Sequence, residues 1–162
     1  MTARVITPTA ACPCGGVAYD KCCQPLHLGG VAVSAESLMR SRFSAFSLKN
    51  TDYIIATTTP SQQTLLDKQG LVAWADEMNW ARLEVVSHIP KIGKRHAQVK
   101  FRAYFRNKDG SEGCHEELSA FVKIGERWYF LDPTVPNTLT GKQLCLCGSG
   151  EKFKACCGKF LA

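Results

Sequence analysis

The sequence predicts an α+β fold, in which helices are followed by long antiparallel strands, with a small cysteine-rich unit at each end. Three observations support this. Apolar residues recur with helical spacing between residues 34 and 78, they alternate with polar residues between 83 and 131, and eight of the nine cysteines form two groups of four. Helices that precede strands, instead of alternating with them, are typical of an α+β domain. We expect terminal units at 1–30 and 139–162 and a middle domain at 31–138.

The helical part begins at Ser34, a good N-cap residue, with Glu36 in the first turn. Apolar residues then follow at Leu38, Met39, Phe43, Phe46 and Leu48. Asp52 is expected to cap a second short helix, which should end by Thr59 because a residue before proline disfavours the helical conformation. A third helix is expected over 62–67, resuming over 71–78 after a break at Gly70.

The strands are expected over 83–89, 97–105, 114–124 and 127–131. Pro90 and Gly93 should turn the first strand into the second, residues 107–110 form the next turn, and Gly125-Glu126 the last. A sheet with helices on one side only tends to curl over them. We therefore expect a cone-shaped cavity between the helices and the sheet.

The two cysteine groups repeat one pattern: Cys12, Cys14, Cys22 and Cys23, and then Cys145, Cys147, Cys156 and Cys157. Four thiolates per group match the closed tetrahedral shell of a structural zinc site, so two zinc ions are expected. Disulfides are the alternative, but cysteines this close in sequence form strained bridges, and nine is an odd count. His27 could replace one thiolate in the first group. The ninth cysteine, Cys114, is most simply a small strand residue.

The cytoplasm is the expected location. Residues 1–11 lack the apolar run of a signal peptide, and no stretch approaches the roughly 18 apolar residues of a membrane span. A reducing compartment also favours metal-bound thiolates over disulfides. The formal charge of +6 does not indicate nucleic-acid binding, because two zinc ions with four thiolates each would remove about four positive charges. Lys91, Lys94 and Arg95 are expected in a solvated turn, and the lysines near the C-terminus beside the anionic metal centre.

The C-terminal segment C-L-C-G-S-G-E-K-F-K-A-C-C-G (145–158) resembles the SEC-C motif. That motif is best known from the C-terminus of the bacterial preprotein translocase ATPase, where it binds zinc and docks an export chaperone. The resemblance implies that Cys145, Cys147, Cys156 and Cys157 are the ligands. The N-terminal group has one residue fewer between its cysteine pairs, so its zinc is predicted to leave first under mild chelation.

Two further segments extend the resemblance to almost the whole chain. L-M-R-S-R-F-S-A-F (38–46) and W-Y-F-L-D-P-T (128–134) resemble the YchJ family of bacterial proteins. This family carries a SEC-C motif at each end of an NTF2-like domain. The resemblance implies a cone-shaped NTF2-like fold for the middle domain. It does not imply an activity, because NTF2-like domains include enzymes, ligand binders and interaction modules.

Strand periodicity supplies candidate pocket residues. His115, Glu117, Ser119 and Phe121 share one face of the third strand, and Trp128, Phe130 and Asp132 share a face of the fourth. If both faces line the cavity, His115, Glu117 and Asp132 are acid–base candidates, with Arg40 or Arg42 approaching from the first helix. The alternatives are a buried ion-pair network or an outer-face location.

Two functions follow as hypotheses. The first, which we favour, is a non-enzymatic docking protein that binds a protein partner through its zinc units, in export, chaperone or ribosome-related work. The second is small-molecule binding or catalysis in the cavity. A homodimer through the outer face of the sheet is also expected, at Lys100, Arg102, Tyr104 and Arg106.

Overall fold

The computed structural model describes residues 5–161 and has the predicted α+β class. Short elements, the 3₁₀ helix η1 (Tyr19–Lys21) and α1 (Gln24–His27), form the N-terminal unit. The middle helices are α2 (Ala35–Ser47), α3 (Thr51–Ala56), α4 (Pro60–Gln63) and α5 (Lys68–Glu77). The strands β1 (Trp80–Ile92), β2 (His96–Arg106), β3 (Glu112–Ile124) and β4 (Arg127–Leu131) pair antiparallel in sequence order. The 3₁₀ helix η2 (Phe153–Ala155) and α6 (Gly158–Leu161) complete the C-terminal unit.

Side-chain caps set the starts of α2, α3 and α5. Ser34 caps α2 as predicted, its hydroxyl accepting from the Ser37 amide at 3.0 Å. The predicted cap of α3 is wrong: Asn50, not Asp52, accepts the Tyr53 amide. The predicted break at Gly70 is also wrong, because Asp67 caps α5 and accepts the Gly70 amide in its first turn. The expected helix over 62–67 is instead the single turn α4, which starts at Pro60, a favourable first helical position.

The first strand is longer than predicted. β1 continues through Pro90 to Ile92, and the chain turns at Gly93, whose φ is +62°. Proline is tolerated there because β1 is an edge strand, where one side of the backbone needs no partner. Irregular pairing between Ile89 and Ile92 accommodates it. β2 follows the predicted alternation, but residues 119–122 of β3 are buried on both faces, because Val122 packs under the C-terminal unit while Phe121 faces the helices. Gly125 supplies the positive φ of the β3–β4 turn.

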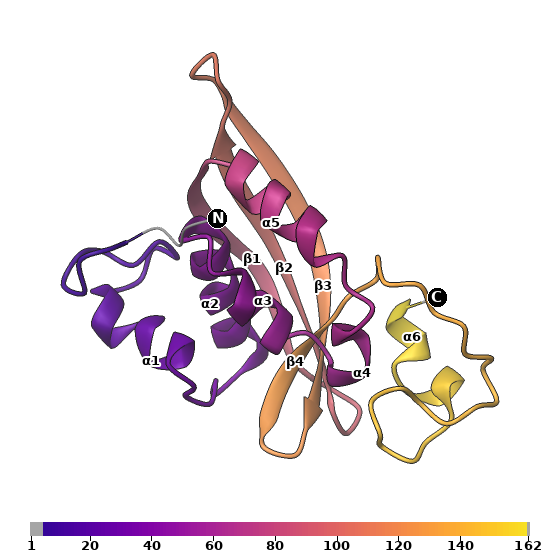
Figure 1. Ribbon diagram of the computed structural model, residues 1–162. Coiled ribbons are helices and arrows are strands. Elements are labelled where there is room, and N and C mark those ends of the chain that lie inside the picture. The colour runs from indigo at the N-terminus through magenta and orange to yellow at the C-terminus, as the bar shows by residue number, and fades with distance from the viewer. Residues whose placement is uncertain (1–4, 162) are drawn as a thin grey trace.

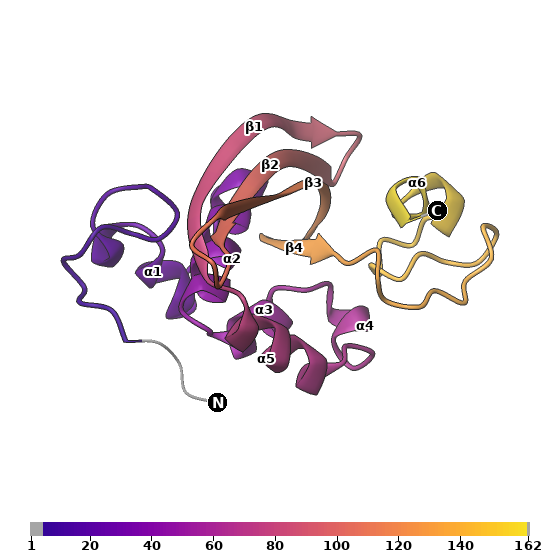
Figure 2. The same ribbon diagram turned by 90° about the horizontal axis from the view of Figure 1, so that it is seen from above.

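The sheet is strongly curved, with α2, α3 and α5 on its concave side (Figures 1 and 2). Val99 and Phe121 are fully buried under α2. The two cysteine-rich units lie on opposite sides of this domain, the N-terminal unit beside α2 and the C-terminal unit beyond β4 (Figures 1 and 2). In the part of the chain described, no helix is long and apolar enough to cross a bilayer.

The outer face of β1–β3 is covered by charges that pair within the face. Arg102 contacts Glu84 at 3.2 Å and Glu116 at 2.7 Å, and Lys100 contacts Glu116 at 3.5 Å. Tyr104 also donates to Glu84. Exposed Cys114 lies opposite Tyr104 on the same face. The homodimer through this face stays a prediction.

Candidate metal centres

Each cysteine group forms a compact cluster of four sulfur atoms. The N-terminal tetrad is Cys12, Cys14, Cys22 and Cys23, and the C-terminal tetrad is Cys145, Cys147, Cys156 and Cys157. In each, all four Sγ atoms lie within 4.8 Å of one another. Cys14 and Cys22 are 3.5 Å apart, as are Cys147 and Cys156. These separations far exceed a disulfide bond of about 2.05 Å. They are close to the roughly 3.8 Å between sulfurs bound tetrahedrally at about 2.3 Å from one zinc ion. Both tetrads could therefore hold a metal ion.

The two tetrads are built by the same local backbone. In each, a glycine with positive φ follows the C-x-C pair, Gly15 at +89° and Gly148 at +80°. A one-turn 3₁₀ helix then begins with a buried aromatic residue, Tyr19 or Phe153, and ends at the second cysteine pair. The two ends of the chain are thus a structural repeat, and each end positions its own four thiols with the same backbone turns.

The one-residue difference between the connectors is absorbed before the 3₁₀ helix. The Cys12 amide donates to the Val17 carbonyl, whereas the matching Cys145 amide donates to Glu151, one residue further along. The shorter turn brings Gly16 against the metal-binding group: a Cβ there would lie 2.7 Å from the Cys22 Sγ. Only glycine fits without displacing that sulfur. The second cysteine pair therefore keeps its phase in the N-terminal tetrad.

Crowding of the thiols perturbs their ionisation. Hydrogen bonds from Cys14 and Cys23 hold the pKa of Cys12 far below its usual value. The hydrogen bond between Cys12 and Cys23 in turn raises the pKa of Cys23. In the C-terminal tetrad, a hydrogen bond from Cys157 is the main cause that lowers the pKa of Cys147 to about 4. Burial raises the pKa of Cys22 to about 12. One thiol in each tetrad therefore ionises readily, whereas Cys22 and Cys23, and Cys145 and Cys157, have raised pKa values and keep their protons until a cation displaces them.

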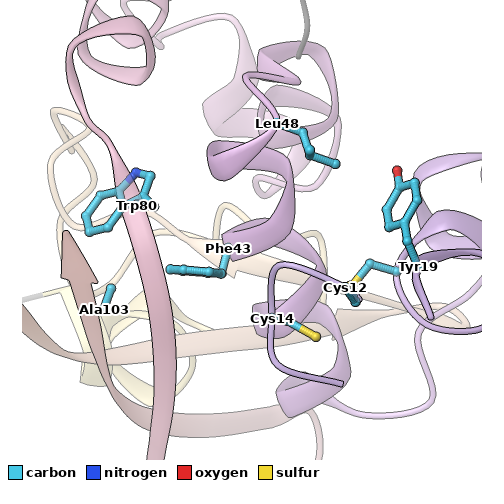
Figure 3. Packing of buried hydrophobic residues seen from close by; sticks show 8 residues of the cluster. Cys12, Cys14, Tyr19, Phe43, Leu48, Trp80 and Ala103 are labelled. Atoms are coloured by element: carbon cyan, nitrogen blue, oxygen red, sulfur yellow. The ribbon is translucent and has the colours of Figure 1, made fainter. Parts of the chain in front are cut away.

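The N-terminal tetrad is attached to the middle domain through α2. Ser44, fully buried on α2, donates to Cys23 Sγ at 3.3 Å and lies 3.4 Å from Cys12 Sγ. Figure 3 shows Cys12 and Cys14 on one side of α2, with Phe43 pointing from the helix toward Trp80 on the other. The tetrad therefore shares one hydrophobic cluster with the sheet.

His27 does not replace a thiolate. Its Nδ1 is 2.6 Å from the Tyr19 hydroxyl, and its Nε2 is 2.8 Å from the Ser41 carbonyl. Because a carbonyl only accepts, Nε2 carries the proton and Nδ1 accepts from Tyr19. Burial lowers the pKa of His27, which favours this neutral form. The imidazole holds the N-terminal unit to α2 and is not one of the four metal-binding groups.

The C-terminal tetrad packs on the outer face of the sheet, with Val122 and Leu131 in the same cluster. His96, the buried first residue of β2, places Nε2 3.3 Å from Cys157 Sγ. Arg95 forms a salt bridge with Glu151 and reaches Cys156 Sγ at 3.7 Å. The expectation of a wholly solvated turn at Lys91, Lys94 and Arg95 is therefore wrong for Arg95.

Sequence reasoning missed Ser44, His96 and Arg95 as neighbours of the sulfurs. None lies near a cysteine in sequence, so spacing carries no signal for them. Such residues matter because groups that hydrogen-bond the ligands orient them and tune the metal affinity. Their positions follow from how the units pack on α2 and β2.

A cavity of about 320 Å³ lies between the helices and the concave face of the sheet. Most of the candidate pocket residues line it, namely Arg42, His115, Glu117, Ser119, Phe121, Phe130 and Asp132. His115 contacts Glu117 at 3.2 Å, and Ser119 also donates to Glu117. Trp128 does not line this cavity, although it lies on the expected face of β4. It borders a separate depression beside α1 and α3.

Arg40 and Arg42, two residues apart on α2, point to different surroundings. Arg40 pairs with Glu36 and donates to the Cys14 carbonyl, so it belongs to the N-terminal unit. Arg42 is buried in the cavity wall, its guanidinium 4.5 Å from the centre of the Phe130 ring. Burial lowers the pKa of Arg42 to about 10, which leaves it charged at neutral pH.

The curved α+β domain and the two cysteine tetrads define the class: an NTF2-like domain with SEC-C-type cysteine units. Residues 34–133 match the family described as YchJ, middle NTF2-like domain, and residues 142–159 match the SEC-C motif. The chain belongs to the YchJ family.

Relatives and solved structures agree with this assignment. A UPF0225 protein of Actinobacillus succinogenes is 50% identical, with 94% of this chain and 99% of the relative covered. One from Haemophilus influenzae is 49% identical, over 93% of each chain. The crystal structure of a SEC-C motif containing protein from Psychrobacter arcticus has a TM-score of 0.89 and 49% identity, covering 94% of this chain and 98% of that one. A solution structure from Rhodopseudomonas palustris has a TM-score of 0.69 and 40% identity, covering 76% and 96%.

Proposed function

We propose that this protein is a cytoplasmic, zinc-stabilised docking protein that binds a protein partner through its cysteine units. The observation that carries the proposal is that each tetrad offers four thiols, and that seven of these eight cysteines are buried. Cys14, Cys23, Cys156 and Cys157 are at most 2% exposed. A four-sulfur tetrahedral site has no open position for a substrate, so its metal has a structural role. Zinc is the metal that this donor set and geometry favour.

The zinc ions would fix the surfaces of the two units. Each unit contains only single helical turns between its cysteines, which cannot form a stable core alone. The sulfurs of each tetrad already lie within 4.8 Å of one another, so reaching the tetrahedral spacing of about 3.8 Å needs only small shifts. Loss of zinc should therefore disorder the units more than the middle domain.

The surface of the C-terminal unit indicates the kind of partner. Leu144 is 67% exposed and pairs with Lys152 in an isolated bridge, and Lys154 and Lys159 are also exposed. The acidic Glu151 of this unit is already paired with Arg95. Among residues 5–161 these lysines form no salt bridge, and an exposed apolar residue beside them suits an acidic partner segment that carries an apolar side chain.

The metal part of the proposal is tested by native mass spectrometry of protein purified without chelator or added metal. Two zinc ions per chain are expected, together with the number of protomers. No zinc, with masses short by whole disulfides, would refute it.

The docking part is tested by partner capture with charge variants. The double variant Lys152→Glu/Lys154→Glu should lose the partner while it keeps both zinc ions. The matched control Arg106→Glu/Lys108→Glu has the same charge change at the distant β2–β3 turn and should keep the partner. Capture that survives both chelation and the Lys152/Lys154 change would contradict docking through the C-terminal unit.

A further inference from the structure

The cavity holds a buried cation whose hydrogen bonds are incomplete. Both hydrogen bonds of the Arg42 guanidinium come from Nη1, to the Ile54 carbonyl at 2.9 Å and the Thr57 hydroxyl at 2.6 Å. Within residues 5–161, Nε and Nη2 have no protein acceptor, and the guanidinium makes no salt bridge. Arg42 is nevertheless only 7% exposed. A buried charge is costly unless it is paired and fully hydrogen-bonded.

The two carboxylates of the cavity, in contrast, already accept hydrogen bonds from neighbouring residues. Glu117 already accepts hydrogen bonds from Ser119 and His115. Asp132 accepts from the Thr134 amide at 2.8 Å and from its hydroxyl. Both carboxylates act on Arg42 through their charge, which raises its pKa against the larger effect of burial, but neither forms a salt bridge or hydrogen bond with it among the described residues. The group of this cavity that still lacks a protein acceptor is therefore the Nε–Nη2 edge of Arg42, and a carboxylate would supply both acceptors and a charge.

Most of the remaining wall is apolar and rich in aromatic rings. Phe43, Phe46, Trp74, Trp80 and Phe101 line the cavity. Trp74 packs edge-on against both Phe46 and Trp80, with centroids 5.2 and 5.6 Å apart. Trp80 is 8% exposed, and its Nε1 has no partner among the described residues. A volume of about 320 Å³ lies at the lower end of the range for small-molecule sites, about 300–1,000 Å³.

We propose that the cavity binds a small amphipathic carboxylate, whose anionic group pairs with the Nε–Nη2 edge of Arg42 and whose apolar body packs among the aromatic side chains. Guanidinium and carboxylate match as a two-pronged pair, and the low-polarity wall strengthens the attraction. The site is independent of the proposed docking role, because neither tetrad contributes a residue to the cavity lining.

The test uses three probes with the same phenylpropyl skeleton: phenylpropionate, phenylpropanol and phenylpropylamine. Binding to the zinc-loaded protein is followed by NMR through the indole N–H signals. The chain has three tryptophans, of which Trp74 and Trp80 line the cavity and Trp128 does not. Phenylpropionate should shift the first two signals and leave the third. It should bind at least about tenfold more tightly than the alcohol, because hydrogen bonds between charged groups contribute more than neutral ones.

Arg42→Gln should remove the preference for the carboxylate without weakening the alcohol. Arg40→Gln is the matched control on the same helix and should keep the preference. If Arg42→Gln does not fold, Ala103→Leu replaces it: Ala103 lines the cavity, so the larger side chain should weaken phenylpropionate binding by occupying its space. The proposal is overturned if the amine binds most tightly, if no probe binds, if Arg42→Gln keeps the carboxylate preference, or if Ala103→Leu leaves binding unchanged.

Discussion

Replacing Ser44 by alanine tests how the middle domain supports the N-terminal tetrad. The Ser44 hydroxyl is fully buried and lies 3.3 and 3.4 Å from two of the four sulfurs, Cys23 and Cys12. With zinc bound, both sulfurs are thiolates, so the hydroxyl donates to a negatively charged acceptor. Ser44→Ala leaves that thiolate without its donor and adds no bulk.

The magnitude follows from the number of hydrogen bonds lost. A hydroxyl has one proton and donates to one sulfur at a time, and a hydrogen bond to a charged group contributes about 1.5–3 kcal/mol. A loss of about 2 kcal/mol lowers the affinity of the N-terminal site for zinc roughly thirtyfold. That lies within the 10–100-fold range typical of groups that hydrogen-bond metal ligands.

The assay is native mass spectrometry during titration with a zinc chelator, which follows the change from two bound zinc ions to one. Ser41→Ala is the control, because Ser41 is equally buried on α2 but bonds to the Leu38 carbonyl and the Tyr53 hydroxyl. Ser41→Ala should lower the free energy of unfolding and leave zinc affinity unchanged. Equal zinc loss in both variants, or wild-type retention in Ser44→Ala, would refute the reasoning.

Four further outcomes are expected. The N-terminal zinc should leave before the C-terminal zinc under mild chelation, because Cys22 is partly exposed whereas every C-terminal ligand is buried; the reverse order in tetrad-specific cysteine variants would contradict this. Gly16→Ala should displace the Cys22 sulfur and leave one zinc per chain in the same spectra. His96→Phe should keep the ring packing and remove the donor to Cys157, weakening the C-terminal site about 10–100-fold; an unchanged affinity would argue against a role for the imidazole. Leu131→Ala, at a side chain 1% exposed, should cost about 2–5 kcal/mol in urea unfolding of the zinc-loaded protein.

The α+β class and the cysteine groups could be predicted from the sequence because both are local patterns. Alternation from Ala97 to Phe105 determines which side chains face the helices, since a strand repeats every two residues. The C-x-C and C-C pairs place two thiols each within a few ångströms by backbone turns alone. The boundaries were less accurate where two local signals compete, as at Pro90, where the expected turn proved to be an edge strand that needs no amide donor at that position.

Tertiary structure alone decided what surrounds each site. Trp128 and Phe130 share a strand face, yet only Phe130 lines the cavity, because the helices divide that face between two depressions. Ser44 is 21 residues from Cys23, and His96 is 61 residues from Cys157. No periodicity links such pairs, since they meet only where one packed element is laid against another. The sequence by itself determined the two sets of four thiols and the class of fold. The packing of the cysteine-rich units on α2 and β2 determined which serine and which histidine support them, and the packing of α2 on the sheet buried Arg42 in the cavity without a salt bridge to any described residue.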